Sequence, residues 1–282
     1  MDNVIMKKYH GLGNDYLILD PNKNQIKLNP RYIERLCRRN FGVGADGILY
    51  GPILEQGRIG LTIYNPDGTM ASRSGNGVRI FARYLLEEGY VKEPEFSIQT
   101  VLGPVEIECL KDDPKQIRVN MGKPSYAGNE IPVAGGDGME IINAPMRFHD
   151  SIYNTTCLSV GTPNCVIMLE EVTKRKAVEL GPYVERAGYF PNRMNLQLLK
   201  VLDRENIQIE IYERGAGYTL ASGTGACAAA AVARRMGLVE NQVTVHMPGG
   251  SLFIELCPDG TIFMTGPVEY VGEIRVAEDF LA

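Results

Sequence analysis

A Ser-Gly-x-Gly segment occurs twice in this chain, at Ser74–Gly77 and, 148 residues later, at Ser222–Gly225. Each copy runs directly into an apolar, helix-forming stretch. Glycines let backbone amides approach a ligand closely, and the unpaired N–H groups and dipole of a helix N-terminus favour an anion. The two segments therefore predict two sites for a carboxylate or a phosphate. The simpler alternative is that Ser74 and Ser222 are ordinary N-caps, but their occurrence as a matched pair favours a binding role.

The two segments belong to a longer internal repeat. At the same offset, residues 63–64 (Ile-Tyr) fall on residues 211–212 (Ile-Tyr), and residues 13–18 fall on residues 161–166. One match would be chance, but a shared offset across separate motifs indicates an internal duplication. We expect two structurally similar halves.

Each half has the pattern of a strand, a helix, further strands, a second helix and a hairpin. Alternating apolar residues predict strands, and Asn-Pro, Pro-Asp-Gly and single glycines mark helix starts, turns and helix stops. The expected strands are 16–19, 59–64, 105–108, 116–120, 164–169, 207–212, 252–256 and 261–265, and the expected helices begin near 29, 74, 172 and 222. The helices that begin near 74 and 222 are expected to stop at Gly89 and Gly237.

Strands outnumber helices, and hairpins outnumber crossovers, which indicates an α+β protein. We expect two pseudo-symmetric domains, each a curled, mostly antiparallel sheet around or against a central helix, with the active site in the interdomain cleft. The expected boundaries are 1–120, together with a C-terminal segment at about 268–282, for one half and 121–267 for the other.

Composition excludes several functional classes. The chain has 282 residues, 44% of them hydrophobic and 22% charged, with a net charge of −5, so no basic field is expected to hold nucleic acid. The apolar runs are too short for a membrane span and the N-terminus lacks a signal-peptide pattern, so we expect a cytoplasmic protein without a membrane partner. Six cysteines without a Cys-x-x-Cys pair predict neither a metal site nor a disulfide framework.

Seven stretches together carry a family resemblance. They are 10–16 (His-Gly-Leu-Gly-Asn-Asp-Tyr), 44–47 (Gly-Ala-Asp-Gly), 64–68 (Tyr-Asn-Pro-Asp-Gly), 74–79 (Ser-Gly-Asn-Gly-Val-Arg), Asn195, 213–217 (Glu-Arg-Gly-Ala-Gly) and 223–227 (Gly-Thr-Gly-Ala-Cys). With these residues the chain resembles the diaminopimelate epimerases, which are pyridoxal-independent amino-acid epimerases, over nearly its whole length. That family's fold of two similar domains closing on one substrate agrees with the duplication.

The resemblance implies a two-base epimerisation at the α-carbon of LL- or meso-diaminopimelate, a step of lysine biosynthesis, with no cofactor. Such a reaction needs a base on one face of the carbon, an acid on the other, and stabilisation of the developing carboxylate charge. By resemblance, the backbone amides of Gly75, Asn76, Gly223 and Thr224 hold the α-carboxylate. The expected contacts to the rest of the substrate are Asn14, Asn65, Thr162, Asn195, Glu213 and Arg214. Glu213 and Arg214 could instead form a structural ion pair.

The resemblance fails at both catalytic positions, where the family's cysteines are replaced by Ser74 and Ser222. A hydroxyl has a pKa near that of water, several units above the value of about 8.5 for a free thiol. No His or Lys within either motif could act as an activating base. We therefore expect an inactive Cys-to-Ser form of an epimerase, or, as the alternative, a natural non-catalytic amino-acid-binding protein.

Three further departures affect the choice of substrate. The family's Gly-Asn-Pro-His is replaced by Gly-Thr-Pro-Asn, with Thr162 and Asn164 at the changed positions, and a family glutamate is replaced by Tyr218. A bulkier and less charged pocket would suit histidine or another amino acid handled by relatives, although diaminopimelate stays the first choice. The only partner expected is the small-molecule substrate, and a homodimer is left open.

Overall fold

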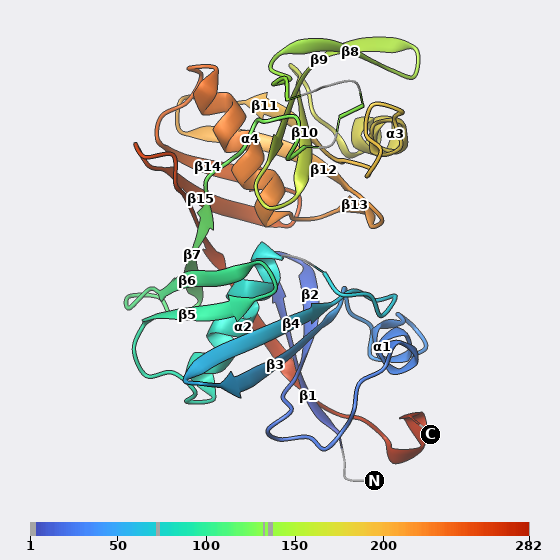
Figure 1. The fold of residues 1–282 in the computed structure, drawn as a ribbon, viewed down its shortest axis with the longest axis vertical. Coiled ribbons are helices and arrows are strands. Elements are labelled where there is room, and N and C mark those ends of the chain that lie inside the picture. Colours follow the sequence, from blue (N-terminus) through green and yellow to red (C-terminus); the bar gives the residue numbers. More distant parts are fainter. Residues whose placement is uncertain (1–3, 72–73, 132, 135–137, 282) are drawn as a thin grey trace. The chain divides into compact units, whose positions relative to one another are not determined.

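The computed structural model describes residues 4–71, 74–131, 133–134 and 138–281, and the chain divides into two compact units (Figure 1). Unit 1 comprises Met1–Val119 and Gly266–Ala282, and unit 2 comprises Asn120–Thr265. Both units are α+β, and each contains a mixed, mostly antiparallel sheet and two α-helices among the described residues. The predicted fold class is confirmed.

The sheet of unit 1 is built from strands in the spatial order β17, β1, β2, β3, β4, β5, β6 and β7. The pairs β2–β3 and β4–β5 are parallel, and the other pairs are antiparallel. The elements are β1 (Ile5–Gly11), β2 (Asn14–Leu19), α1 (Pro30–Cys37), β3 (Ile48–Glu55), β4 (Arg58–Tyr64), α2 (Gly75–Glu87), β5 (Glu95–Thr100), β6 (Gly103–Cys109), β7 (Gln116–Gly122), β17 (Glu269–Arg275) and the 3-10 helix η1 (Glu278–Leu281).

Unit 2 repeats this plan in the order β8, β9, β10, β11, β12, β14, β15 and β16. Here β10–β11 and β12–β14 are the parallel pairs, and β13 adds to β12 as a short antiparallel strand. The elements are β8 (Ala144–Phe148), β9 (Ser151–Ser159), β10 (Pro163–Met168), α3 (Lys174–Glu185), β11 (Asn195–Val201), β12 (Asn206–Glu213), β13 (Gly217–Thr219), α4 (Gly223–Arg235), β14 (Gln242–Met247), β15 (Gly250–Leu256) and β16 (Ile262–Pro267).

Each sheet curls around one buried helix. In unit 1, α2 contacts β1, β2, β3 and β6, and in unit 2, α4 contacts strands from β9 to β15. Because strands from distant parts of one sheet all contact the same helix, the sheet must bend around it. The helix is correspondingly apolar on nearly every side, as in the alanine run of α4, where residues 226–233 are all buried.

The two central helices begin and end at equivalent positions of the repeat. Ser74 and Ser222 are the N-caps, with extended backbones at φ −146° and φ −141°. Past the other end, Gly89 and Gly237 adopt left-handed conformations at φ 73° and φ 72°, which glycine adopts without steric cost. The predicted starts and stops of both helices are confirmed.

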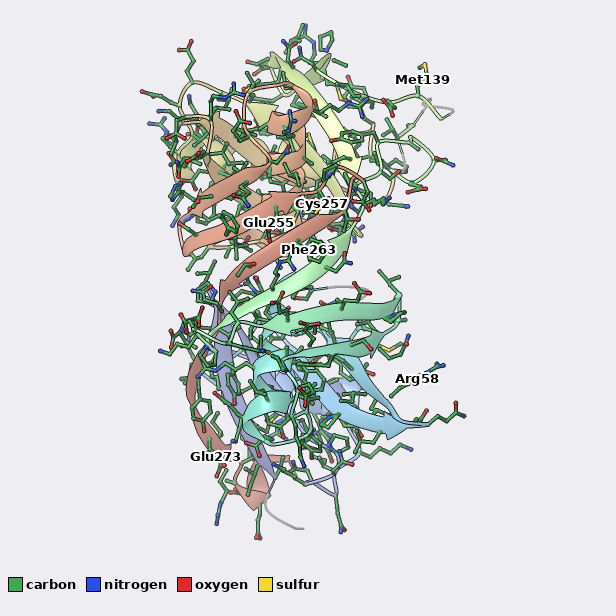
Figure 2. All side chains as sticks on the ribbon, turned by 90° about the vertical axis from the view of Figure 1, so that its left-hand side faces the viewer. Arg58, Met139, Glu255, Cys257, Phe263 and Glu273 are labelled. Atoms are coloured by element: carbon green, nitrogen blue, oxygen red, sulfur yellow. The ribbon has the colours of Figure 1, made fainter. Side chains whose placement is uncertain are left out.

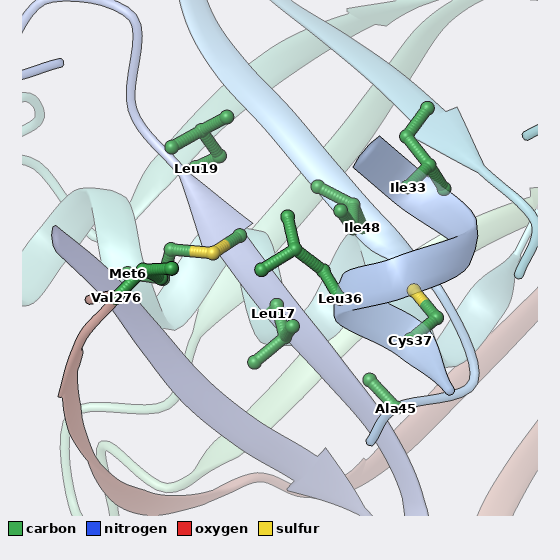
Figure 3. Close-up of a cluster of buried hydrophobic side chains, with 9 residues drawn as sticks. All are labelled: Met6, Leu17, Leu19, Ile33, Leu36, Cys37, Ala45, Ile48 and Val276. Atoms are coloured by element: carbon green, nitrogen blue, oxygen red, sulfur yellow. The ribbon is translucent and has the colours of Figure 1, made fainter. Parts of the chain in front are cut away.

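A second core of unit 1 lies on the outer face of the sheet, beneath α1 (Figure 3). Leu17 and Leu19 of β2 point toward Leu36 of α1, together with Ile48 of β3. Because successive side chains of a strand point to opposite faces, the intervening residues of β2 face the central helix α2. β2 is therefore buried on both faces, and it carries residues to the end of α2.

Among the described residues, nine strands have no counterpart in the sequence prediction, namely β1, β3, β5, β8, β9, β11, β13, β14 and β17. Two of them illustrate the reasons. β1 carries two consecutive lysines, which break the expected alternation, but Lys8 pairs with Asp15 at 2.8 Å and Lys7 pairs with Glu88. β9 begins with exposed residues that show no apolar alternation, and it becomes buried only in its second half. In β1, tertiary contacts outweigh the local pattern.

The free cysteines are mostly buried, and Cys257, which follows β15, is the partly exposed one. Figure 2 shows it near Glu255 and Phe263, which lie opposite each other in the β15–β16 ladder. Among the described residues, no helix is long and apolar enough to cross a membrane.

Gly181 lets α3 pack closely on β12. A Cβ added there would lie 2.2 Å from Cγ and 2.7 Å from Cβ of Tyr212, near the fixed base of that side chain. We expect Gly181→Ala to lower the free energy of unfolding by about 1–3 kcal/mol through overpacking, measured by urea denaturation. Gly188→Ala is the matched control, because a Cβ at that position meets nothing within 4 Å. Equal stability of the two variants would contradict this packing.

Candidate functional site

The N-terminus of α2 is organised around the side chain of Ser74. Its Oγ accepts the backbone N–H of Gly77 at 3.0 Å and lies 3.1 Å from the hydroxyl of Tyr16 on β2. A Cβ at Gly77 would lie 3.1 Å from Leu49 Cδ2 and 3.2 Å from Ser74 Oγ. A larger residue here would be tightly packed against both side chains, so the glycine favours the close packing of this helix start.

The N-terminus of α4 repeats this arrangement. Ser222 Oγ accepts the N–H of Gly225 at 3.2 Å, and a Cβ at Gly225 would lie 2.8 Å from Nε2 of Gln197. Ser222 and Thr224 are both buried. The N-cap interpretation of both serines is geometrically correct, and the N–H groups of the first helical residues remain outside the intrahelical hydrogen-bond ladder, as at any helix start.

A second contact ties each helix start to the strand beside it. In unit 1, Asn76 Nδ2 donates to Asn14 Oδ1 at 3.0 Å, and in unit 2, Thr162 Oγ1 donates to Thr224 Oγ1 at 3.0 Å. Asn14 and Thr162 are equivalent in the repeat, and so are Asn76 and Thr224. The structure thus brings together four of the expected substrate-binding residues as two equivalent pairs, one in each unit.

In unit 1 a chain of polar contacts extends from this pair in both directions. The fully buried Arg79 donates to Asn76 Oδ1 at 2.7 Å, and Asn14 Nδ2 donates to Asp46 Oδ2 at 2.8 Å. Both ends of the Asn14 amide are therefore engaged, which fixes its orientation. The network holds the loop at the start of β2 against α2.

Asp15 anchors the outer end of this network. Arg39 bridges it and Asp46 at 2.5 Å and 2.8 Å, and Lys8 lies 2.8 Å from it. Burial alone would raise the pKa of Asp15, but the hydrogen bonds from Arg39 and Lys8 outweigh burial and hold that pKa below its ordinary value. The carboxylate is therefore ionised and paired at neutral pH.

In unit 2 the corresponding layer is made of amides. Gln197 Nε2 donates to Asn164 Oδ1 at 3.1 Å, and Asn164 Nδ2 donates to the Thr162 carbonyl at 2.6 Å. Gln197 Oε1 is buried without a partner among the described residues, which is a costly arrangement. At the equivalent positions unit 1 has Leu49 and Tyr16, so the two helix starts rest on chemically different layers.

The turn after β12 is held by two acceptors. Asn195 Oδ1 accepts the backbone N–H of Arg214 at 2.8 Å, and the buried Glu185 accepts the N–H of Gly215 at 3.0 Å. The Arg214 guanidinium is exposed and donates to the Asn192 carbonyl at 3.0 Å. Glu213, which ends β12, is partly exposed next to it. The contacts found for Asn195 are those of a residue that positions the turn.

Two other residues named from the sequence are engaged locally. Asn65 Nδ2 donates to Thr69 Oγ1 at 3.0 Å within its own turn, so the structure does not join it to the Asn14 network. Tyr218 donates to Glu210 Oε2 at 2.7 Å. Burial and this hydrogen bond raise the pKa of Tyr218 above its ordinary value, so the residue is a neutral phenol.

Several residues of these networks were not predicted as site residues from the sequence, and Tyr16, Arg79, Glu185 and Gln197 are the ones that contact the helix starts or the turn after β12. The glycine at the end of the motif at 44–47 was an indirect signal that a large side chain packs there. A Cβ at Gly47 would lie 2.8 Å from Tyr16 Cε1 and 2.3 Å from the Tyr64 carbonyl oxygen. That glycine leaves room for the Tyr16 ring. Arg79 and Gln197 carry no such local sign, since their burial depends on the whole sheet.

The chain is similar in sequence to known proteins over nearly its whole length. The sequence model of the diaminopimelate epimerase family matches residues 6–127 and 156–271. A protein of Nostoc sp. named diaminopimelate epimerase 2 is 45% identical over 276 residues, covering 98% of this chain and 96% of its own length. The diaminopimelate epimerase of Moorella thermoacetica is 38% identical over 264 residues, covering 92% and 94%.

Solved structures resemble the fold at much lower identity. A hydroxyproline epimerase from Agrobacterium vitis, with bound trans-4-hydroxy-L-proline, superimposes with a TM-score of 0.69 at 14% identity, covering 98% of this chain and 91% of that one. A Bacillus anthracis protein of the PhzF family gives a TM-score of 0.66 at 15% identity, covering 98% and 100%. These two likenesses show a shared fold.

Removing the charge of Asp15 should destabilise unit 1. We expect Asp15→Asn to lower the free energy of unfolding at pH 7 by about 1.5–3 kcal/mol, the usual range for hydrogen bonds to a charged group. Because the folded pKa is below the ordinary value of 3.8, the stabilisation is present above about pH 4 and is lost as pH falls through the folded pKa.

Urea titrations between pH 2 and pH 7 measure this difference. Asp112→Asn removes the same charge from an exposed loop and serves as the control, with an expected change within about 0.5 kcal/mol. A difference between Asp15→Asn and the parent chain that was as large at pH 2 as at pH 7 would contradict the assignment of the stabilisation to the ionised carboxylate.

Proposed function

The chain belongs to the diaminopimelate epimerase family, and from this premise we propose that it is built to bind LL- and meso-diaminopimelate for epimerisation at the α-carbon without a cofactor. The supporting observation is the repeated helix start. Ser74 and Ser222 cap α2 and α4 in the same conformation, with one glycine N–H on each Oγ. A duplicated site suits a reaction that acts on two faces of one carbon.

In this proposal the free N–H groups of Gly75, Asn76, Gly223 and Thr224 hold the α-carboxylate. Two helix dipoles would stabilise the extra negative charge that the carboxylate gains when the α-proton leaves. The pairs Asn14–Asn76 and Thr162–Thr224 support the role because each fixes the first turn of its helix. A site that is already organised has little reorganisation to undergo during the reaction.

Positions 74 and 222 would carry the acid and the base. With serine at both, proton transfer lacks a group of suitable acidity, because a hydroxyl is roughly seven pKa units weaker than a free thiol. We therefore propose that the chain binds its substrate in a catalytically inactive form. The hydrogen bonds to the glycine N–H groups support this, since they retain the hydroxyls as caps.

The turn at 213–217 is proposed to receive the distal end of the substrate. Arg214 is exposed there, and its planar guanidinium can bind a carboxylate through two parallel hydrogen bonds. Asn195 and Glu185 act on the backbone of the turn and would set its position. The names of the relatives support diaminopimelate as the substrate.

Two alternatives rest on specific residues. A racemase of histidine or another amino acid with one carboxylate is favoured by Tyr218, which places an aromatic ring where the family has a carboxylate. A natural amino-acid-binding protein is favoured by the two serines themselves. Tight binding of both stereoisomers supports the inactive epimerase, whereas binding of one stereoisomer alone supports the binding protein.

Restoring the thiols should restore the chemistry. We expect Ser74→Cys/Ser222→Cys to exchange the α-hydrogen of diaminopimelate with deuterium from the solvent, because a helix N-terminus lowers the pKa of a thiol. The parent chain should show no exchange under the same conditions. The matched control Ser74→Ala/Ser222→Ala should also be inactive. Exchange of histidine but not diaminopimelate would favour the alternative substrate, and exchange of neither would refute both.

Arg214 should discriminate between ligands that have or lack a distal carboxylate. We expect Arg214→Lys to weaken binding of diaminopimelate by about tenfold or more, since a lysine cannot make the bidentate contact. Binding of lysine, which lacks that carboxylate, should change by less than about threefold. Calorimetric titration of the parent chain and the variant measures both. Arg175→Lys, exposed on α3, is the control, and equal losses for the two ligands would contradict the role.

A further inference from the structure

The hydroxyl of Tyr16 lies 3.1 Å from Ser74 Oγ. Tyr16 is 7% exposed, and it projects from β2 toward α2 because Leu17 and Leu19 occupy the opposite face. The ring has little freedom, since Gly47 leaves room for it and nothing more on that side. The phenol is thus held against the side chain at one of the two proposed proton-transfer positions.

Unit 2 lacks this contact. The repeat equivalent of Tyr16 is Asn164, whose amide donates to the Thr162 carbonyl and accepts from Gln197. Among the described residues, the hydrogen bond found for Ser222 Oγ is the one from the Gly225 N–H. The side chain at position 74 therefore has two neighbouring donors, the Tyr16 hydroxyl and the Gly77 backbone N–H. For the side chain at position 222, the corresponding donor is the Gly225 backbone N–H.

This asymmetry matters when the side chain at position 74 is an anion. An anionic oxygen or sulfur can only accept hydrogen bonds, so the Tyr16 hydroxyl must then be the donor. It would act together with the Gly77 N–H and the start of α2, and hydrogen bonds to an anion are stronger than those between neutral groups. In unit 2, the repeat equivalent of Tyr16 is Asn164, and its amide donates to the Thr162 carbonyl and not to residue 222.

We propose that Tyr16 is a positioning residue that holds the side chain at position 74 and stabilises its anionic form, which makes the two faces of the site unequal. The proposal rests on the proposed function for its catalytic meaning, since position 74 then carries the group that is already ionised and ready to accept the α-proton. The effect of Tyr16 on the ionisation of residue 74 does not depend on a bound substrate. A cysteine placed at 74 should be ionised more readily than one placed at 222, and Tyr16 should be the cause.

Four variants test this directly: Ser74→Cys, Ser222→Cys, and each of these combined with Tyr16→Phe. The apparent pKa of each new thiol is measured from its rate of alkylation by iodoacetamide between about pH 5 and pH 10, followed by mass spectrometry of the peptide containing residue 74 or 222. Tyr16→Phe should raise the apparent pKa at position 74 by about one unit, a tenfold loss of rate below that pKa. It should leave position 222 unchanged.

The same spectra show whether Tyr16→Phe loosens the fold. Cys37 and Cys227 are buried, so their alkylation must stay slow for the comparison to report on the hydroxyl. An unchanged apparent pKa at position 74 would overturn the proposal. An equal rise at positions 74 and 222 would also overturn it, since that result would indicate a general structural effect.

A second measurement separates this proposal from the proposed function. In Ser74→Cys/Ser222→Cys, the further change Tyr16→Phe should lower kcat for α-hydrogen exchange of diaminopimelate about tenfold with KM unchanged. If the double cysteine variant exchanges no amino acid, the proposed function fails while the alkylation result still decides the role of Tyr16. A fall in affinity with kcat unchanged would assign Tyr16 to substrate binding and overturn its role as a positioning residue.

Discussion

The structure depends on one constraint, which is that the first backbone N–H groups of a buried helix have no partner within that helix. Both α2 and α4 begin inside their units, where water cannot satisfy these groups freely. The serine at each N-cap accepts one of these N–H groups, that of Gly77 or Gly225. The N–H groups of the two residues between the serine and that glycine are left for other acceptors. Glycines beside the serines permit the close packing that the buried start requires. The candidate site is therefore a direct consequence of placing a helix start in a core.

The curled sheets create the burial that makes this constraint strong. A single helix inside a curled sheet contacts strands from both ends of the sheet order, so its side chains are apolar on nearly all sides. Polar side chains then survive only in connected networks. In unit 1 that network runs from Arg79 through Asn76 and Asn14 to Asp46, and it ends in ion pairs near the surface. Each side chain of this network has a hydrogen-bond or ion-pair partner, which makes its burial tolerable.

Duplication has given the two units the same skeleton with different polar layers. The contacts Asn14–Asn76 and Thr162–Thr224 occupy equivalent positions, which shows how closely the backbones correspond. Beneath them, Tyr16 and Leu49 in unit 1 are replaced by Asn164 and Gln197 in unit 2. The backbone geometry of the helix starts is thus shared, whereas the surroundings of Ser74 and Ser222 differ. Such a division suits a reaction in which the two faces of one carbon have different roles.

The sequence by itself was sufficient for the fold class, the repeat, and the starts and stops of α2 and α4. These features depend on local chemistry, namely the capping serines and the glycines at left-handed positions, and local chemistry can be read along the chain. The strand β1 could not be predicted, because its polar residues break the alternation and are stabilised in part by a partner distant in sequence, as Lys7 is by Glu88.

Only the tertiary structure decided which side chains surround the two serines. Tyr16 reaches Ser74 across 58 residues of sequence, and the contact exists because the register of β2 turns that ring toward α2 instead of toward α1. The same kind of register places Tyr218 on Glu210 and Gln197 beneath α4. A shift of one residue would send each of these side chains to the opposite face. The motif identifies the helix start, and the surrounding sheet determines the chemistry available to it.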